Sequence, residues 1–134
     1  MNGTLVDSNV LIDIMSENSE WCDWSAAMLA DIARREPTFI NPIIYAEIAF
    51  GFDRIEDLES AAPAAFYRRL PLPWEAAYLA GRCFVDYRRR GGVRRSPMPD
   101  FYIGAHAAVA DLTLLTRDPT RYSAYFPRLR LIAP

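Results

Sequence analysis

A short apolar run near the start of the chain ends abruptly on a carboxylate. The segment TLVDSNVLI, at residues 4–12, places Asp7 between a buried strand and a helix that Ser8 or Asn9 would cap. In an open parallel α/β sheet, ligands bind outside the carboxyl ends of the strands. The segment therefore predicts an α/β fold with Asp7 at a position suited to chemistry, although a helix-capping role would explain the same carboxylate.

Strand-like and helix-like segments alternate along the rest of the chain. We predict a strand that ends at residues 5–6 and further strands at 38–40, 112–116 and 130–132. Helices are predicted at 9–15, 19–36, 42–50, 74–90 and 101–110. Residues 52–70 are expected to form one or two short helices broken near Pro63, and Trp74 and Tyr78 are expected to face inward. The alternation predicts a three-layer α/β/α sandwich with a central, mainly parallel sheet, in a single domain over residues 1–134.

The chain contains no lysine, because all 15 basic residues are arginine. A P-loop requires a Gly-Lys-Ser/Thr segment, and receiver domains and phosphoryl-aspartate enzymes also use a lysine, so these classes are excluded. One histidine and two distant cysteines, Cys22 and Cys83, cannot assemble a zinc site. Reduced cysteines, the absence of a signal-peptide pattern and the lack of a long apolar run predict a cytoplasmic protein with no membrane segment.

The two halves of the chain carry opposite charges. Residues 1–67 hold 3 arginines and 12 acidic residues, a net charge of −9, whereas residues 68–134 hold 12 arginines and 5 acidic residues, a net charge of +7. The basic half contains an arginine cluster, formed by Arg88, Arg89, Arg90, Arg94 and Arg95. Such a cluster favours contact with a polyanion such as RNA, but a solvated helix end and loop would have the same composition.

Four acidic residues occupy related positions. Asp7 and Asp118 follow expected strands, Asp100 opens an expected helix, and Glu47 falls on the apolar stripe of the helix at 42–50. A glutamate on an apolar stripe is unfavourable unless it is paired, neutralised or bound to a metal. In a right-handed βαβ arrangement these four residues can converge on one edge of the sheet.

A cluster of carboxylates requires a cation or a proton. Two carboxylates about 4 Å apart repel by about 4 kcal/mol at an effective dielectric constant of about 20. Ligand sets made only of oxygen select hard ions, so the acids point to Mg²⁺ or Mn²⁺. Such ions would activate a water for attack on a phosphodiester and leave a 5′-phosphate and a 3′-hydroxyl. One histidine and no lysine argue against a 2′-hydroxyl nucleophile.

The segments around these acids resemble the successive motifs of the PIN-domain family. They are LVDSNVL at 5–11, Glu47 in its helix, DFYIGA at 100–105 and LTRD at 115–118, and the resemblance extends from about residue 5 to residue 132. Within that family the chain resembles the small, VapC-type toxins of VapBC toxin–antitoxin pairs. The resemblance implies a metal-dependent endoribonuclease, a hydrolase of phosphodiester bonds that is usually homodimeric and is held inactive by a cognate antitoxin.

The resemblance also implies roles for individual residues. The acidic quartet, which would hold one or two Mg²⁺ or Mn²⁺ ions and carry catalysis, consists of Asp7, Glu47, Asp100 and Asp118. Neighbours that shape the site are Ser8, Asn9 and Thr116. Arg117 joins the arginine cluster as an expected RNA contact. His106 lies six residues after Asp100, on another face of the helix, so we expect it to be structural.

Two other functions fit the same acids. A metal-dependent phosphatase would act on small phosphoesters, and a chromogenic monoester would distinguish it from a ribonuclease. A PIN-like binding module would have lost its activity, but such modules usually lack one of the four acids, whereas all four are present in this sequence.

Overall fold

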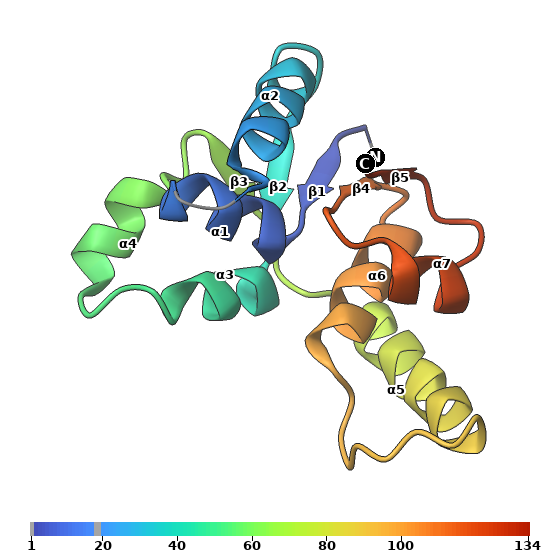
Figure 1. Cartoon of the computed structure of the whole chain (residues 1–134). Helices are drawn as coiled ribbons and strands as arrows, with labels where there is room; N and C mark the ends of the chain where they lie inside the picture. Colours follow the sequence, from blue (N-terminus) through green and yellow to red (C-terminus); the bar gives the residue numbers. More distant parts are fainter. Residues whose placement is uncertain (1, 18–19) are drawn as a thin grey trace.

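Five short strands form the centre of the molecule (Figure 1). The computed structural model describes residues 2–17 and 20–134, and the elements named here are those of this part. The strands are β1 (Thr4–Val6), β2 (Thr38–Ile40), β3 (Tyr67–Arg69), β4 (Thr113–Leu115) and β5 (Leu131–Ile132). The helices are α1 (Ser8–Ser16), α2 (Cys22–Ala33), α3 (Pro42–Ala49), α4 (Ile55–Ala61), α5 (Trp74–Arg89), α6 (Pro99–Val109) and α7 (Thr120–Tyr125).

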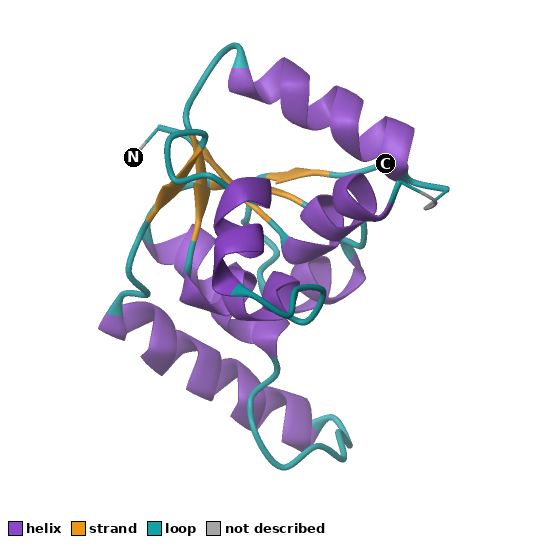
Figure 2. Cartoon of the chain, turned by 90° about the vertical axis from the view of Figure 1, so that its left-hand side faces the viewer, coloured by secondary structure: helices purple, strands orange, loops and turns teal. Residues whose placement is uncertain are grey.

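The strands form one parallel sheet in the order β3-β2-β1-β4-β5. β1 lies at its centre, with Thr4 opposite Thr38 on one side and Thr113 on the other. Helices cover both faces of the sheet (Figure 2), which confirms the predicted three-layer α/β/α sandwich. Because all the strands run in the same direction, their carboxyl ends meet at one edge, where ligands bind in such folds.

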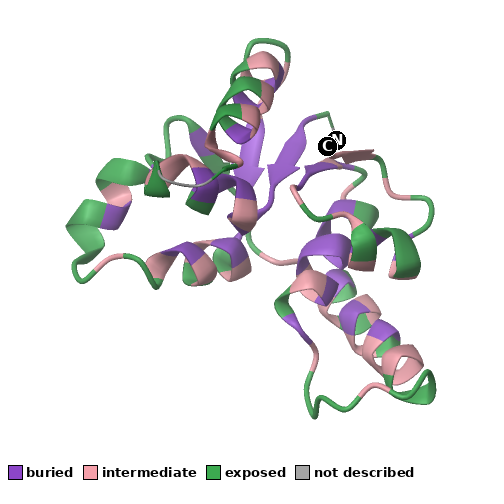
Figure 3. Ribbon diagram, in the orientation of Figure 1, coloured by how far each residue is buried: buried purple, intermediate pink, exposed green. Residues whose placement is uncertain are grey.

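The central strand is completely buried (Figure 3). Its three residues, Thr4, Leu5 and Val6, have no exposed surface. A parallel strand covered on both faces forms a continuous apolar run instead of an alternating pattern, which explains why this segment could be recognised in the sequence. Around it the core includes the fully buried side chains of Ile40, Ile44, Phe101, Ile103 and Leu114.

The strand β3 is absent from the prediction, which placed only short helices between residues 52 and 70. The structure forms one helix there, α4, followed by an edge strand that pairs with β2. Only Tyr67 of this strand is buried, and Arg68 and Arg69 are exposed. Charged side chains are typical of an edge strand, and three residues with one buried side chain give no readable period. The prediction was therefore wrong for this segment.

The orientation of α5 also differs from the prediction. Trp74 and Tyr78 are 89% and 72% exposed, whereas the buried residues of this helix are Ala76, Ala80 and Cys83. Two positions correspond to about 200° around a helix, so Trp74 and Tyr78 lie opposite Ala76. α5 packs against α6, and small side chains allow that close contact. Trp74 and Tyr78 are therefore outside the core.

The remaining helices lie near their predicted positions. The expected helix at 19–36 corresponds to α2, although Ser19 lies outside the described residues. α3 begins as predicted, because the side chain of Asn41 accepts a hydrogen bond from the Ile44 N–H and Pro42 occupies the first turn. None of the described helices is long and apolar enough to cross a membrane.

Candidate active site

The four predicted acids line one cavity of about 350 Å³. Asp7 follows β1, Glu47 lies in α3, Asp100 is in the first turn of α6, and Asp118 lies between β4 and α7. Four elements distant in sequence therefore supply carboxylates to the same space, called the acidic cavity below. Its other lining residues are Ser8, Asn9, Ile12, Arg117 and Tyr122.

Asp7 is almost completely buried and accepts hydrogen bonds on both carboxylate oxygens. Its Oδ1 accepts from the backbone N–H of Ser8 at 2.8 Å, so Asp7 caps α1 and lines the cavity at the same time. Its Oδ2 accepts from the hydroxyls of Thr116 at 2.8 Å and Tyr122 at 2.9 Å. Burial, together with the charges of Asp100 and Glu47, raises the pKa of Asp7 to about 6 against the lowering effect of these hydroxyls.

Glu47 lies at the border of the buried face of α3. Its Oε1 accepts a hydrogen bond from the hydroxyl of Ser8 at 2.8 Å, which joins α3 to the start of α1. Burial and the charge of Asp100 raise the pKa of Glu47, although the Ser8 hydroxyl opposes the change. The free-energy cost of a carboxylate at this position, inferred from the sequence, is thus offset by the hydrogen bond from Ser8 and by access to the cavity.

Asp100 is held between a phenol and an arginine. The Tyr122 hydroxyl lies 3.4 Å from its Oδ1, and the Nη1 of Arg121 lies 3.5 Å from its Oδ2. Burial raises the pKa of Asp100, Arg121 and Tyr122 lower it, and the charge of Asp118 raises it. The carboxylates of this cavity therefore raise one another's pKa: Asp118 acts on Asp100, and Asp100 acts on Asp7 and Glu47.

The loop that carries Asp118 is fixed by hydrogen bonds to α1. The Oγ1 of Thr116 accepts from the backbone N–H of Asp118 at 3.2 Å and from the Nδ2 of Asn9 at 3.2 Å. The Oδ1 of Asn9 accepts from the backbone N–H of Arg117 at 3.1 Å. These contacts place the predicted neighbours Ser8, Asn9 and Thr116 directly against the acids or their backbone.

The side chain of Arg117 points to a buried carboxylate. Its Nε lies 2.8 Å from the Oδ2 of Asp13, which is 3% exposed and also accepts from the hydroxyl of Ser25 at 2.9 Å. A buried carboxylate without a cation would be strongly destabilising. The Asp13–Arg117 pair therefore fixes the end of β4 against α1 and occupies the Nε of this guanidinium.

The arginine cluster lies at the end of α5 and in the loop that follows. All five of its side chains are exposed, and none of them lines the acidic cavity. The Nη1 of Arg88 donates to the backbone carbonyl of Arg94 at 2.8 Å, and Arg90 pairs with Asp86 at 2.8 Å. The cluster is an exposed basic surface, and its contact with RNA stays a prediction.

Tyr122 lines the acidic cavity although it is not among the site residues predicted from the sequence. The residue is buried, and its hydroxyl is shared between Asp7 and Asp100. A buried tyrosine normally finds a partner for its hydroxyl, so a tyrosine four residues after Asp118 was the available signal. The sequence does not show, however, that the short helix α7 turns this side chain back toward β1.

His106 connects two helices of the site without lining the acidic cavity. The Nδ2 of Asn41 lies 3.0 Å from its Nδ1, and Asn41 also caps α3. The amide donates this bond, so Nδ1 carries no proton. Burial lowers the pKa of His106, which favours the same neutral form. The residue therefore links α6 to the beginning of α3.

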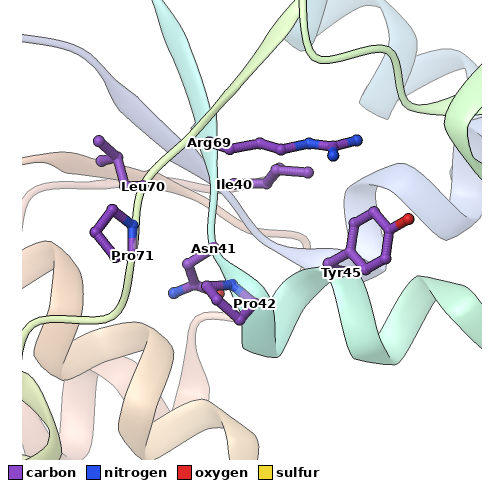
Figure 4. A pocket seen from close by; sticks show the side chains of 7 residues that line it. All are labelled: Ile40, Asn41, Pro42, Tyr45, Arg69, Leu70 and Pro71. Carbon is purple, nitrogen blue, oxygen red and sulfur yellow. The ribbon is translucent and has the colours of Figure 1, made fainter.

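A separate apolar cavity of about 410 Å³ lies at the carboxyl ends of β2 and β3 (Figure 4). Ile40, Leu70 and Pro71 line it together with Tyr45, over whose ring the Arg69 guanidinium lies at 5.0 Å. Its lining contains no acidic residue. This cavity therefore lacks the chemistry of the acidic cavity despite its larger volume.

The donor set of the acidic cavity suits a hard divalent cation. Its acids and hydroxyls offer oxygen ligands, as Mg²⁺ and Mn²⁺ require. In the described part of the chain, no three His, Cys, Asp or Glu side chains are placed so that they could hold a metal ion as they stand. The oxygen donors of the cavity fit such an ion. Because the side chains do not yet surround one point, ion binding would require the carboxylates to move toward one another.

Comparisons with known proteins agree with this architecture. The family model described as "PIN domain" matches residues 4–126. A search of curated proteins finds no match. The solved structures include similar chains in VapBC2 from Rickettsia felis bound to a DNA fragment from its promoter, in VapBC-1 from nontypeable Haemophilus influenzae and in FitAcB from Neisseria gonorrhoeae.

The similarity to these structures extends over nearly the whole length of both chains. The R. felis chain has a TM-score of 0.75 and 16% identity, with 98% of each chain covered. The H. influenzae chain has a TM-score of 0.72 and 18% identity, with 99% of this chain and 98% of that chain covered. The N. gonorrhoeae chain has a TM-score of 0.71 and 19% identity, with 96% of each covered. At these identities the likeness concerns the fold.

Proposed function

Because the chain belongs to the PIN-domain family, we propose that it is a metal-dependent endoribonuclease and the toxin of a type II toxin–antitoxin pair. PIN domains are generally nucleases, which supports a hydrolase acting on nucleic acid. The observation that carries the proposal is the convergence of Asp7, Glu47, Asp100 and Asp118 on one cavity. The proposal treats residues 1–134 as one catalytic domain in the cytoplasm.

The four acids would hold one or two Mg²⁺ or Mn²⁺ ions. When bound, such an ion lowers the pKa of a water molecule and offsets negative charge on the reacting phosphodiester. The protein's part is to hold the carboxylates in place. Ser8 orients both Asp7 and Glu47, and Thr116 orients Asp7 while it fixes the backbone of Asp118.

Glu47 is suited to accept a proton from the attacking water. Burial raises its pKa above the ordinary value for a glutamate, which is the direction that suits a general base. The Ser8 hydroxyl occupies Oε1, which leaves Oε2 as the atom for the proton. Attack by water would then leave a 5′-phosphate on one product and a 3′-hydroxyl on the other.

RNA approaching this negative cavity needs compensating positive charge. The arginine cluster offers an exposed basic surface on the half of the chain with net charge +7. We assign it to the phosphates of the substrate, at positions away from the bond that is cut. Arg117 has a smaller part in this assignment because its guanidinium pairs with Asp13.

The proposed partners are a cognate antitoxin and a second copy of the chain. The VapBC complexes among the structural neighbours support an antitoxin partner. An antitoxin encoded beside this chain would restrain the nuclease, and the homodimer follows from the family resemblance. Purification with the product of the adjacent open reading frame tests the first, and the mass of the purified chain in solution tests the second.

The function itself is tested by cleavage of RNA with mapped ends. Purified protein with Mg²⁺ should cut RNA to 5′-phosphate products, EDTA should stop the reaction, and added Mg²⁺ or Mn²⁺ should restore it. Asp100→Asn should abolish cleavage, whereas the exposed Asp111→Asn should leave it unchanged. Activity that survives chelation would exclude the metal mechanism, and hydrolysis of a chromogenic monoester without RNA cleavage would identify a phosphatase.

A further inference from the structure

Another cavity, of about 440 Å³, adjoins the acidic cavity beside α7. It shares Asp100 and Asp118 with the acidic cavity, and Tyr87, Arg121 and Tyr125 also line it. We name it the side cavity. Because the two spaces share two carboxylates, a polymer that places one phosphate against the acids would place a neighbouring unit in the side cavity.

Two tyrosine rings of the side cavity are held by one buried residue. The ring centroids of Tyr87 and Phe101 lie 5.8 Å apart and those of Phe101 and Tyr125 lie 5.0 Å apart, both edge to face. Phe101 is fully buried and follows Asp100 directly in the chain. The two rings are therefore fixed relative to the acid. Phe84 stacks on the ring of Tyr87, so Tyr125 is the ring we consider for a nucleobase, which a fixed ring can bind without ordering a flexible side chain.

Arginines lie beside the acid and beside a ring of the same cavity. The Nη1 of Arg121 lies 3.5 Å from the Oδ2 of Asp100. The guanidinium of Arg90 lies over the ring of Tyr125, 4.6 Å from its centroid. Aromatic faces next to guanidinium groups are typical of sites for single-stranded nucleic acid, where rings stack on bases and arginines contact phosphates.

The loop that follows α5 is attached to Tyr87, which lines the side cavity. The hydroxyl of Tyr87 accepts hydrogen bonds from the backbone N–H groups of Val93 and Arg94, at 3.2 and 3.4 Å. The loop that contains Arg94 and Arg95 is therefore held by a residue that lines the side cavity. Arg121 in the cavity and Arg94 on this loop are two positively charged groups that a strand of several phosphates could contact.

We infer that the side cavity binds the nucleoside next to the scissile phosphate of a single-stranded RNA, with its base against Tyr125 and its phosphate near Arg121. This inference rests on the proposed ribonuclease function and adds a substrate subsite to it. Stacking on a tyrosine accepts any base, so the subsite contributes affinity and position without demanding one particular nucleotide.

The test is a binding measurement with a short fluorescein-labelled RNA and its single-abasic derivatives, each lacking one base at a different position. Anisotropy is measured with Ca²⁺ in place of Mg²⁺, because Ca²⁺ also takes oxygen ligands, and each strand is checked afterwards for intact length. In the wild type, loss of the base at one position should weaken binding roughly tenfold. Tyr125→Leu should bind the intact strand about as weakly and should show no further loss at that position.

Three control variants separate stacking from structural damage. Tyr125→Phe keeps the ring and should retain the wild-type abasic profile, as should Tyr78→Leu at an exposed tyrosine of α5. Ala124→Leu, at an exposed residue of the side cavity, should weaken binding in the same base-dependent way. It serves as the test if circular dichroism shows that Tyr125→Leu is unfolded.

The outcomes distinguish this inference from the proposed function. If the wild type cleaves RNA but Tyr125→Leu and Ala124→Leu keep the wild-type abasic profile, the subsite is wrong and the ribonuclease stands. A base-dependent loss that Tyr125→Leu removes supports the subsite even if no cleavage is observed. A wild type that fails to bind the strand overturns both.

Discussion

The hydroxyl of Tyr122 donates a hydrogen bond to the Oδ2 of Asp7 at 2.9 Å, across 115 positions of sequence. The bond joins the first turn after β1 to the short helix α7, and both groups are buried. The same hydroxyl lies 3.4 Å from Asp100. One hydroxyl therefore lies within hydrogen-bonding distance of two carboxylates, so we expect it to stabilise the acidic cavity in the absence of a cation.

Removal of this hydroxyl should destabilise the metal-free protein. Tyr122→Phe keeps the buried ring and removes a hydrogen bond to a charged group, so the free energy of unfolding in EDTA should fall by about 1.5–3 kcal/mol. Urea denaturation measures the change. Tyr78→Phe, at an exposed tyrosine, is the control and should change nothing. An unchanged midpoint for Tyr122→Phe would mean that the bond contributes nothing to stability.

Asp7 should make the metal-free protein less stable as the pH rises. The pKa of Asp7 is about 6 in the folded protein against an ordinary value of 3.8, so between these values the folded state holds a proton that the unfolded chain has released. The free energy of unfolding attributable to Asp7 therefore falls with rising pH, by about 3 kcal/mol over that interval. In Asp7→Asn this fall should disappear.

The measurement compares the two proteins in EDTA at a series of pH values. The stability of Asp7→Asn relative to the wild type should increase from about pH 4 to about pH 6 and stay constant above it. A difference that does not vary with pH would show that Asp7 titrates normally, and the buried carboxylate would then need another source of stabilisation.

His106 should have the opposite dependence on pH. Burial lowers the pKa of His106 below its ordinary value of 6.5, so in acid the unfolded chain binds a proton that the folded protein does not. The contribution of His106 to the free energy of unfolding is therefore fully present above about pH 6.5 and is lost as the pH drops below that value. His106→Gln cannot titrate, and its thermal unfolding should vary less than that of the wild type between pH 7 and pH 5. Parallel curves for the two proteins would rule out this contribution.

The arginine cluster should determine how RNA affinity depends on salt. Each phosphate contact on a single strand contributes roughly 0.7 to the slope of log affinity against log salt. Arg94→Ala/Arg95→Ala should therefore weaken binding and flatten that slope, while Mg²⁺ still raises the melting temperature. Arg34→Ala/Arg35→Ala removes two exposed arginines paired with Asp31 and serves as the matched control. An unchanged slope for Arg94→Ala/Arg95→Ala would exclude the cluster as the path of the substrate.

Local sequence was sufficient to predict the structure of segments that do not depend on a distant partner. The apolar run before Asp7 predicts a buried strand, and Asn41 with Pro42 predicts the start of α3; both are confirmed. The two interpretations of Asp7 turn out to be compatible, because its carboxylate caps α1 and lines the acidic cavity. Glu47 could be located by helical spacing, since only its own helix decides which face it occupies.

Other features depend on partners that the local sequence does not reveal. The strand at Tyr67–Arg69 exists because β2 offers an edge to pair with, and its own residues carry no pattern. Trp74 is exposed because α6 packs against a different face of α5. Tyr122 reaches Asp7 only through the angle of α7. In each case the deciding contact comes from an element elsewhere in the chain.

The position of β4 beside β1 has a consequence for protein synthesis. β1 is made first, but Thr116 and Tyr122, which hold Asp7, and Asp118 itself come from the last fifth of the chain. A nascent chain on the ribosome therefore has no complete acidic cavity until residues 113–122 have emerged and β4 has inserted next to β1. On the proposed function, the nuclease therefore cannot act before this segment has been made and has folded onto β1.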